Sequence, residues 1–338
     1  MRYLVTVDPG LEQVAADELR QLDPSAAVRV DGRARLVVEA TDGAWLFRAR
    51  TIHHVARLAV EARAGTLDEL RAAIAGTALP ELERAASFRV SANTTGPVSF
   101  PRRELAGAAG AVLQRRYGTR VDLERFEVNV RIDLDGERLL CGVQLTRESL
   151  GGRIHRGEPL RTSLKPTVAA AMLRLAGAHS GSGRLIDPMC GAATIPIEAA
   201  SINPRLSISA ADWDGPTVAL ARRALAGQGI ALEIDRADAR LLGRDRPRAF
   251  DYIVTDPPYG VRLAKRTSLT RLYGALLPSF ERALAERGRI VMIVVKYRTF
   301  LAALATTALE IVDRHAVELG GLEPQIVVLR HPGPAVAD

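Results

Sequence analysis

Cysteine, aromatic residues and long apolar runs are scarce in this sequence of 338 residues. The two cysteines, Cys141 and Cys190, are too few for a disulfide framework and lack the spacing of zinc ligands, so we expect no metal site. No apolar run reaches the ~18 residues that span a bilayer, and the first residues lack the apolar stretch of a signal peptide. We therefore expect a globular, cytoplasmic protein that binds no membrane and acts as a monomer.

Acidic residues are in the minority. The chain carries 46 Lys and Arg against 39 Asp and Glu, which gives a formal net charge of +7. An excess of positive charge favours an anionic partner such as nucleic acid. A compositional bias explains the total equally well, because only Lys165, Lys265 and Lys296 are lysines. The basic runs at 153–165 and 261–271 are more informative, since the second directly follows a proline-rich corner.

The two halves of the chain have different patterns. The first half mixes helices with short alternating strands, and residues 125–145 predict a β-hairpin around Asp135-Gly136. Its other expected strands are 2–7, 34–40 and 87–93, and its expected helices are 8–22, 43–52 and 104–118. From residue 184 onward, short apolar strands alternate with helices, which is typical of a doubly wound parallel sheet. We expect domains at 1–150 and 166–338, a linker at 151–165, and a terminal hairpin at 315–330.

Four successive strands of the second half end in aspartate, at Asp187, Asp212, Asp238 and Asp256. The carboxyl ends of parallel strands share one edge of a sheet, where open α/β folds bind their ligands. Helix N-caps would explain one or two of these acids. Four carboxylates would repel a pyrophosphate, and no G-x-G-x-x-G follows a strand, so a dehydrogenase is disfavoured. A positively charged nucleoside such as S-adenosylmethionine suits the edge better.

Residues 255–260 read TDPPYG and follow an apolar strand. Consecutive prolines cannot continue a central strand, so a stiff corner begins at Asp256. The Asp256 carboxylate and the Pro257 carbonyl can accept both N–H groups of a flat amine, and Pro258 orients Tyr259 to stack on an extruded base. We expect Asp256, Pro257, Pro258 and Tyr259 to be catalytic. A surface turn with Tyr259 packed in the core is the alternative.

Several segments resemble one known family. In order along the chain, LKPTVAAAML (164–173), DPMCGAATIPIEAA (187–200) and DPPYG (256–260) resemble the THUMP-domain class I S-adenosylmethionine-dependent RNA methyltransferases. PGLEQVAADELRQL (9–22) resembles the ferredoxin-like start of that family, and SFRVSANTT (87–95) through GRIHR (152–156) resembles the THUMP domain. The resemblance implies an α/β protein: a C-terminal doubly wound, Rossmann-like methyltransferase sheet after an N-terminal α+β RNA-binding region, ferredoxin-like plus THUMP.

The resemblance also implies roles for individual residues. Asp187 and Gly191 would line the methionine end of the methyl donor, Asp212 would hold its ribose diol, and Asp238 would lie near the adenine amino group. The full set implied for the cofactor S-adenosylmethionine is Thr167, Asp187, Cys190, Gly191, Ala193, Thr194, Asp212, Trp213, Asp238, Ala239 and Asp256.

Ala193 and Trp213 depart from the family pattern. The family has glycine where this chain has Ala193, and an alanine would be strained there if the position requires a positive φ. Trp213 replaces an aliphatic residue, and we expect it to fill the core, with stacking on adenine as the alternative.

The resemblance favours guanine N2 in tRNA as the methyl acceptor. Adenine N6 and cytosine N4 stay open, as do ribosomal RNA and an inactive RNA-binding homologue. We expect arginine and lysine side chains to contact the RNA phosphates. The candidates are Arg102, Arg103, Arg115, Arg116, Arg153, Arg156, Arg262, Lys265 and Arg266.

Overall fold

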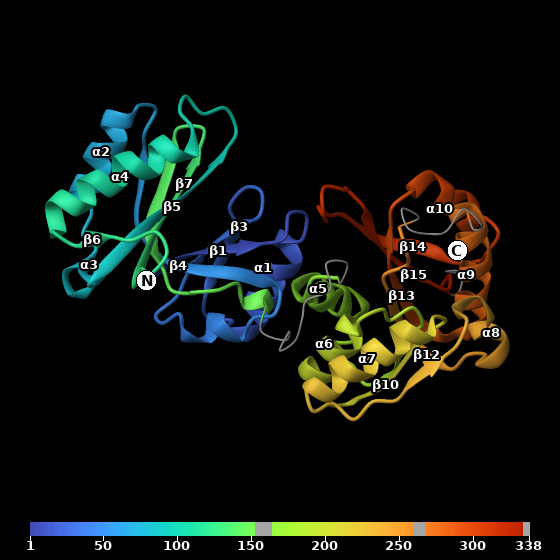
Figure 1. The fold of residues 1–338 in the computed structure, drawn as a ribbon. Coiled ribbons are helices and arrows are strands. Elements are labelled where there is room, and N and C mark those ends of the chain that lie inside the picture. The colour runs from blue at the N-terminus through green and yellow to red at the C-terminus, as the bar shows by residue number, and fades with distance from the viewer. Residues whose placement is uncertain (153–163, 260–267, 334–338) are drawn as a thin grey trace. The chain divides into compact units, whose positions relative to one another are not determined.

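The computed structural model describes residues 1–152, 164–259 and 268–333. It divides into two compact units (Figure 1): residues 1–7 and 16–150 form the first, and residues 8–15 and 151–338 form the second. The second unit thus contains a short segment from near the N-terminus as well as the whole C-terminal part.

The first unit is built on an eight-stranded sheet with the order β2-β3-β1-β4-β8-β7-β5-β6. Helices α2 and α4 cover one face of the β5–β7–β8 part, where Leu113 of α4 packs with Phe88 and Val130 of the sheet. The elements are β1 (Arg2–Val7), α1 (Glu12–Leu22), β2 (Ala27–Val30), β3 (Arg35–Glu39), β4 (Ile52–Arg63), α2 (Leu67–Gly76), α3 (Pro80–Arg84), β5 (Ser87–Thr95), α4 (Arg102–Tyr117), β6 (Arg120–Val121), β7 (Val128–Asp135) and β8 (Arg138–Gln144).

Most of the expected local structure in this unit is confirmed. The hairpin of residues 125–145 is β7 and β8, and Gly136 at its turn has φ +57°. The helix expected at 43–52 is wrong, because only a 3₁₀ turn (Ala44–Arg48) forms there and β4 begins at Ile52. The sequence pattern missed β4, because a register shift between Leu58 and Val60 interrupts its alternation of buried and exposed residues.

The second unit is a doubly wound sheet, as expected. Its strand order is β11-β10-β9-β12-β13-β15-β14, and β15 pairs antiparallel with both β13 and β14. The expected terminal hairpin is confirmed, and Gly320 and Gly321 lie at its turn with positive φ. The elements are α5 (Pro166–Ala176), β9 (Gly183–Asp187), α6 (Thr194–Ile202), β10 (Leu206–Asp212), α7 (Gly215–Gly227), β11 (Ile234–Arg236), α8 (Leu242–Asp245), β12 (Phe250–Thr255), α9 (Leu269–Ala283), β13 (Leu284–Val294), α10 (Tyr297–Leu304), β14 (Glu310–Ala316) and β15 (Gln325–Arg330).

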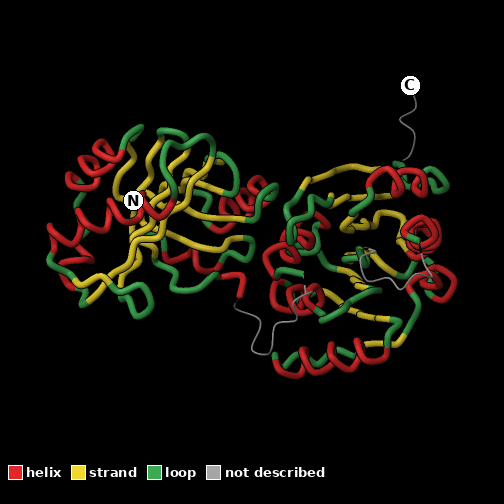
Figure 2. Tube along the Cα trace, turned by 45° about the horizontal axis from the view of Figure 1, so that its top comes forward, coloured by secondary structure: helices red, strands yellow, loops and turns green. Residues whose placement is uncertain are grey.

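Helices cover both faces of this sheet (Figure 2). In β13, Ile290 and Met292 pack with α9 and α10 on one face, whereas Val291 and Ile293 pack with α5 on the other. Strands buried on both faces need apolar residues at every position, which explains why they read as continuous apolar runs. Within the described ranges, no helix combines the length and apolar character needed to cross a bilayer.

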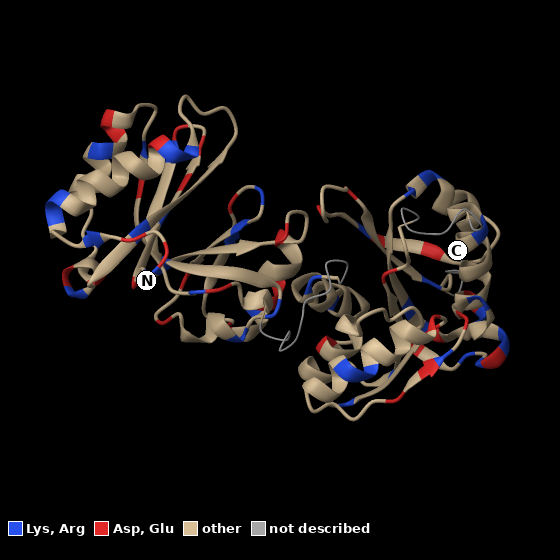
Figure 3. Ribbon diagram, in the orientation of Figure 1, with Lys and Arg blue, Asp and Glu red and all other residues tan. Residues whose placement is uncertain are grey.

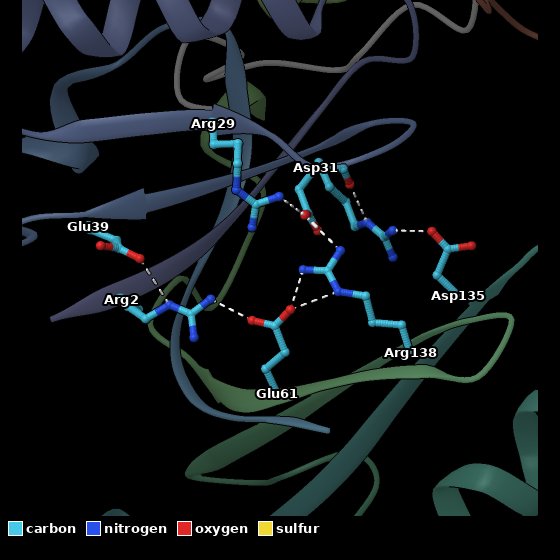
Figure 4. Close-up of polar contacts among 8 residues, drawn as sticks. Arg2, Arg29, Asp31, Glu39, Glu61, Asp135 and Arg138 are labelled. Carbon is cyan, nitrogen blue, oxygen red and sulfur yellow. Dashed lines mark hydrogen bonds and ion pairs between the residues drawn. The ribbon is translucent and has the colours of Figure 1, made fainter. Parts of the chain in front are cut away.

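A network of ion pairs connects the two halves of the eight-stranded sheet (Figure 4). Asp31, after β2, is 2% exposed, and its Oδ1 accepts hydrogen bonds from Arg29 and Arg138, each at 2.7 Å. Arg138 of β8 also donates to Glu61 of β4, from Nε at 2.8 Å. Arg2 of β1 donates to the other oxygen of Glu61.

The network shows that this sheet is strongly curled. Arg35 of β3 donates to Asp135 of β7 at 2.6 Å, although β1, β4 and β8 lie between their two strands in the sheet. Arg35 also donates to the backbone carbonyl of Asp31 at 3.1 Å. The hairpins β2–β3 and β7–β8 are therefore joined by ion pairs, each with one buried partner, as well as by the sheet.

Arg138→Leu should lower the free energy of unfolding by about 2 kcal/mol, because it leaves the buried Asp31 with one guanidinium fewer. The effect should be smaller than the ~3–5 kcal/mol typical of a buried charge left unpaired, since Arg29 remains. Arg63→Leu is the matched control: Arg63 lies in the same region but is exposed and pairs with Glu137 at the surface, so little change is expected. Denaturant titration measures both, and equal losses would contradict the assignment.

Candidate active site

Four aspartates lie at one edge of the second sheet. β9 ends at Asp187 and β10 at Asp212, Asp256 directly follows β12, and Asp238 follows β11 by two residues. Because β9, β10, β11 and β12 run parallel, their carboxyl ends meet at the same edge. The sheet therefore brings the four acids to the edge that the sequence pattern indicates.

Asp187 is only 2% exposed. Its Oδ1 accepts hydrogen bonds from the Thr255 hydroxyl at 2.8 Å and from the backbone N–H of Met189 at 3.2 Å. Burial raises the pKa of Asp187 to about 8; these two hydrogen bonds lower it in part, and the charges of Asp256 and Asp212 raise it again. Thr255 is not among the residues expected from the sequence, although a polar residue directly before D-P-P at the end of an apolar strand was the available signal.

The turn between β9 and α6 requires a left-handed backbone at two positions. Gly191 has φ +54° and Ala193 has φ +63°. The condition for strain at Ala193 is therefore met, and a left-handed alanine costs about 1–2 kcal/mol relative to the right-handed form. A Cβ built on Gly191 would meet no atom within 4 Å, so the turn borders open space that a ligand can enter.

Asp212 links the turn between β9 and α6 to the turn that follows β10. Its Oδ2 accepts from the backbone N–H of Gly191 at 3.1 Å, and its Oδ1 accepts from that of Asp214 at 3.0 Å. Each carboxylate oxygen has a second lone pair, so Asp212 can still accept hydrogen bonds from a diol. The expectation that Trp213 fills the core is wrong, because Trp213 is 71% exposed. β10 ends at Asp212, which leaves Trp213 beyond the packed faces of the strand.

Asp238 is paired with a guanidinium. Its carboxylate accepts from the backbone N–H and the side chain of Arg240, and these side-chain hydrogen bonds hold the pKa of Asp238 below its usual value. An adenine amino group would share the carboxylate with Arg240. Arg240 is not among the residues expected from the sequence, since an arginine two residues after an acid is unremarkable in a chain this rich in arginine. Ala239 is buried beside it.

The corner after β12 carries a carboxylate oxygen without a partner. Oδ1 of Asp256 is buried and has no hydrogen-bond partner among the described residues. The Tyr259 hydroxyl donates a hydrogen bond to the carboxylate, and burial raises the pKa of Asp256 to about 7 against this bond. Pro257 is buried and Pro258 is exposed. A buried acceptor that lacks a donor suits an N–H group brought by a substrate.

Tyr259 is half-buried. Its ring packs against the core cluster that contains Val168 of α5 and Val254 of β12. One part of the ring therefore lies in the core and the rest is accessible. Burial and the neighbouring Asp256 raise the pKa of the Tyr259 hydroxyl, so it stays a hydrogen-bond donor.

The remaining residues of the expected cofactor set are buried. The backbone N–H of Cys190 donates to the Ala211 carbonyl at 2.9 Å, and burial raises the pKa of its thiol, so it stays neutral. Thr194 begins α6 and is 4% exposed. Thr167, at the start of α5, is 1% exposed, and its hydroxyl donates to Asp8. No sequence signal indicates Asp8, which lies 159 residues away.

The expected RNA-binding residues fall into two groups. Arg102 and Arg103 lie in the first turn of α4 and Arg115 and Arg116 in its last turn, all exposed at the two ends of the helix (Figure 3). The other five lie outside the described residues: Arg153, Arg156, Arg262, Lys265 and Arg266. In the described part of the chain, no cluster of His, Cys, Asp and Glu has a metal-binding arrangement.

The edge fits a cationic nucleoside. The charges of Asp256 and Asp212 disfavour ionisation of Asp187, and a sulfonium or an ammonium beside it would favour that ionisation. The open space beside Gly191 borders the same turn. S-adenosylmethionine therefore suits the charge of this edge and the open space beside its turn.

A doubly wound sheet with this acidic edge and a D-P-P-Y corner defines a methyltransferase domain. Residues 153–325 match the family described as RMKL-like, methyltransferase domain, and the chain belongs to it.

Full-length relatives give the same result. The chain is 38% identical to the tRNA (guanine(6)-N2)-methyltransferase of Thermus thermophilus over 96% of this chain and 98% of that one. It is 27% identical to the tRNA (guanine(6)-N2)-methyltransferase of Archaeoglobus fulgidus over 97% and 92%. The crystal structure of TrmN from Thermus thermophilus matches with a TM-score of 0.87 and 33% identity, over 98% of this chain and all of that one. The expected family and fold class are thereby confirmed.

Asp187→Asn should change how stability depends on pH. In the wild type the folded state holds the Asp187 proton up to about pH 8, whereas the unfolded state releases it near 3.8, so stability falls as pH rises between these values. Asparagine keeps the acceptor for Thr255 but does not titrate. The free energy of unfolding of the variant, relative to that of the wild type, should therefore rise by up to ~1.4 kcal/mol per pH unit between pH 5 and 8. Denaturant titration at several pH values measures this, and a difference independent of pH would contradict the assignment.

Proposed function

We propose that this protein transfers a methyl group from S-adenosylmethionine to the exocyclic N2 amine of a guanosine in tRNA. The observation that carries the proposal is the buried Oδ1 of Asp256 at the proline corner, which has no hydrogen-bond partner among the described residues and offers an acceptor to an amine N–H group. The named activities of the full-length relatives support tRNA and guanine N2 as the substrate. The proposal implies action in the cytoplasm, as a monomer.

When bound, S-adenosylmethionine supplies an electrophilic methyl group on a sulfonium. We assign Asp187 and Gly191 to its methionine end, Asp212 to its ribose diol, and Asp238 with Ala239 to adenine. Trp213, exposed directly after Asp212, would stack on adenine. Cys190, Ala193 and Thr194 would shape the turn against the ligand.

The corner residues would prepare the amine. An exocyclic amine donates its lone pair into the base, so acceptors for both N–H groups are needed to direct that lone pair outward. Asp256 and the Pro257 carbonyl are assigned to this task, and Pro258 fixes the path of the chain before Tyr259. A carboxyl group with a pKa near 7 can also take the proton that the amine releases. The accessible part of the Tyr259 ring is assigned to stacking on the base.

The N-terminal region, residues 1–150, would bind the RNA as the ferredoxin-like and THUMP region, with residues 151–165 as the linker. A surface hollow of about 530 Å³ between α2 and α4 supports this assignment. It is lined by Arg71, Arg115 and Arg116 together with three small or apolar residues. Arg116 is held in place by hydrogen bonds to the carbonyls of Ala75 and Thr77. Three guanidinium groups around one hollow suit a phosphate of the RNA backbone.

Asp256→Ala should lower the methyl-transfer rate by about 10²–10⁴, because it removes both the acceptor and the group that takes the proton. The measurement is transfer of labelled methyl to tRNA, with nucleoside mass spectrometry to identify the product. Asp245→Ala, which removes an exposed acid of α8, is the matched control and should keep full activity. Full activity of the Asp256 variant would overturn the mechanism, and methylation of ribosomal RNA in preference to tRNA would overturn the substrate.

The double variant Arg71→Gln, Arg115→Gln should weaken tRNA binding about tenfold at 0.1 M salt. Its plot of log affinity against log salt should be shallower by about 1–2 units, since each lost phosphate contact removes slightly less than one released counterion. Fluorescence anisotropy with labelled tRNA measures both. Arg84→Gln, an exposed arginine of α3 in the same unit, is the control. An unchanged salt slope would exclude the hollow as a phosphate site.

A further inference from the structure

Residues 8–15 are part of the second unit, although the chain runs directly from them into the first on both sides. They link β1 to the first turns of α1. The rest of the second unit begins only at residue 151. A segment so far away in sequence must be held by its own contacts, and three kinds of contact hold it.

Apolar packing is the first. Leu11 is 1% exposed and Val14 is 7% exposed, and both belong to the core cluster that contains Val168 and Met172 of α5 and Ile326 of β15. Burial of each of these two aliphatic side chains stabilises the cluster by about 1.5–3 kcal/mol.

Close backbone approach is the second. Gly10 has φ +92°, and a Cβ built on it would lie 1.7 Å from the carbonyl oxygen of Ala316, at the end of β14. Only glycine fits such a contact between two backbones. The path of the chain between β1 and α1 is therefore matched to the second unit at this point.

A buried carboxylate is the third. Asp8 is 1% exposed; its Oδ1 accepts from the Lys165 ammonium at 2.7 Å and its Oδ2 accepts from the Thr167 hydroxyl. Lys165 and Thr167 flank Pro166, the first residue of α5, and Lys165 offers the helix no capping side chain. A carboxylate beside the first turn of a helix is favoured by the helix dipole. Asp8 thus fixes the start of α5 from outside the helix.

The start of α5 is coupled to the proline corner by packing. Leu164, just before the helix, and Tyr259 both pack against the cluster that contains Leu11, Val14 and Val168. The Tyr259 hydroxyl in turn donates to Asp256. A change in the position of α5 would therefore reach the residues of the corner through one continuous cluster.

We propose that Asp8 is a positioning residue of the methyl-donor site, which acts by holding Thr167 and Lys165 at the start of α5. The inference rests on the proposed function, since it names a residue that supports the same site. In this proposal the Thr167 hydroxyl binds Asp8 and does not contact the donor directly.

Calorimetric titration of the full-length protein with S-adenosylmethionine tests the proposal. Asp8→Ala should weaken donor binding about tenfold, the effect expected when a charge-assisted hydrogen bond is lost. Asp8→Asn should recover most of that loss, because its amide oxygen still accepts from Thr167. Affinity for tRNA should stay within twofold of wild type in both. Asp17→Ala, which removes an exposed acid of α1 paired with Arg20, is the control and should change neither affinity.

A double-mutant cycle between Asp8→Ala, which cannot accept from Thr167, and Thr167→Val separates the two roles for Thr167. If Thr167 acts through Asp8, the two changes together weaken donor binding less than the sum of their separate effects. Equal effects of Thr167→Val in both backgrounds would overturn the proposal, as would donor affinity within twofold of wild type in Asp8→Ala. If Asp8→Ala does not fold, Asp8→Ser, whose shorter side chain cannot reach Thr167, takes its place in the cycle. A wild type that binds no donor would instead refute the proposed function.

Discussion

Burial of the Asp187 carboxyl group is the constraint on which the acidic edge depends. Two hydrogen bonds, from Thr255 and from the Met189 N–H, only partly compensate for its removal from water, and the group keeps its proton up to about pH 8. Asp212 and Asp256 add to this cost because their charges lie nearby. The ionised form of Asp187 is thus unsatisfied at this edge unless a cation lies beside it. A positively charged donor would favour release of this proton, which couples donor binding to the buried group.

The charged residues of the first unit differ from those of the acidic edge, because several of them are paired with groups of opposite charge. Residues 1–150 contain as many acidic as basic side chains, 21 of each. Of the arginines, Arg2, Arg35 and Arg138 are neutralised by carboxylates in the network of Figure 4. Net charge is therefore a poor guide to RNA binding in this protein. Arg115 and Arg116, at the C-terminal end of α4, differ because they line a hollow that no acid lines within the described chain. Arg71 of α2 lines the same hollow and also pairs with Asp68.

The sequence predicts the second unit well because local pattern and tertiary position coincide there. Apolar runs that end in Asp187, Asp212 and Asp256 are buried parallel strands, and the double proline fixes the corner whatever surrounds it. Trp213 was misjudged because exposure depends on where β10 stops, which hydrophobicity does not reveal. β4 was missed because its bulge interrupts the alternation. The contacts of Thr167 and Asp238 could not be predicted, since each is decided by a partner side chain.

The N-terminal segment shows why boundaries along the sequence and boundaries in the fold differ in this protein. A linear division places residues 1–150 in one domain, yet Leu11 and Val14 complete the core beside α5, and Gly10 fits against the backbone at Ala316. A single cut in the chain would therefore leave the second unit without part of its core and without the carboxylate at the start of α5. Because helical periodicity records only that Leu11 and Val14 are buried, and not against which partner, the unit that they complete cannot be read from the sequence. The methyltransferase unit is thus defined by its contacts and is discontinuous in the chain.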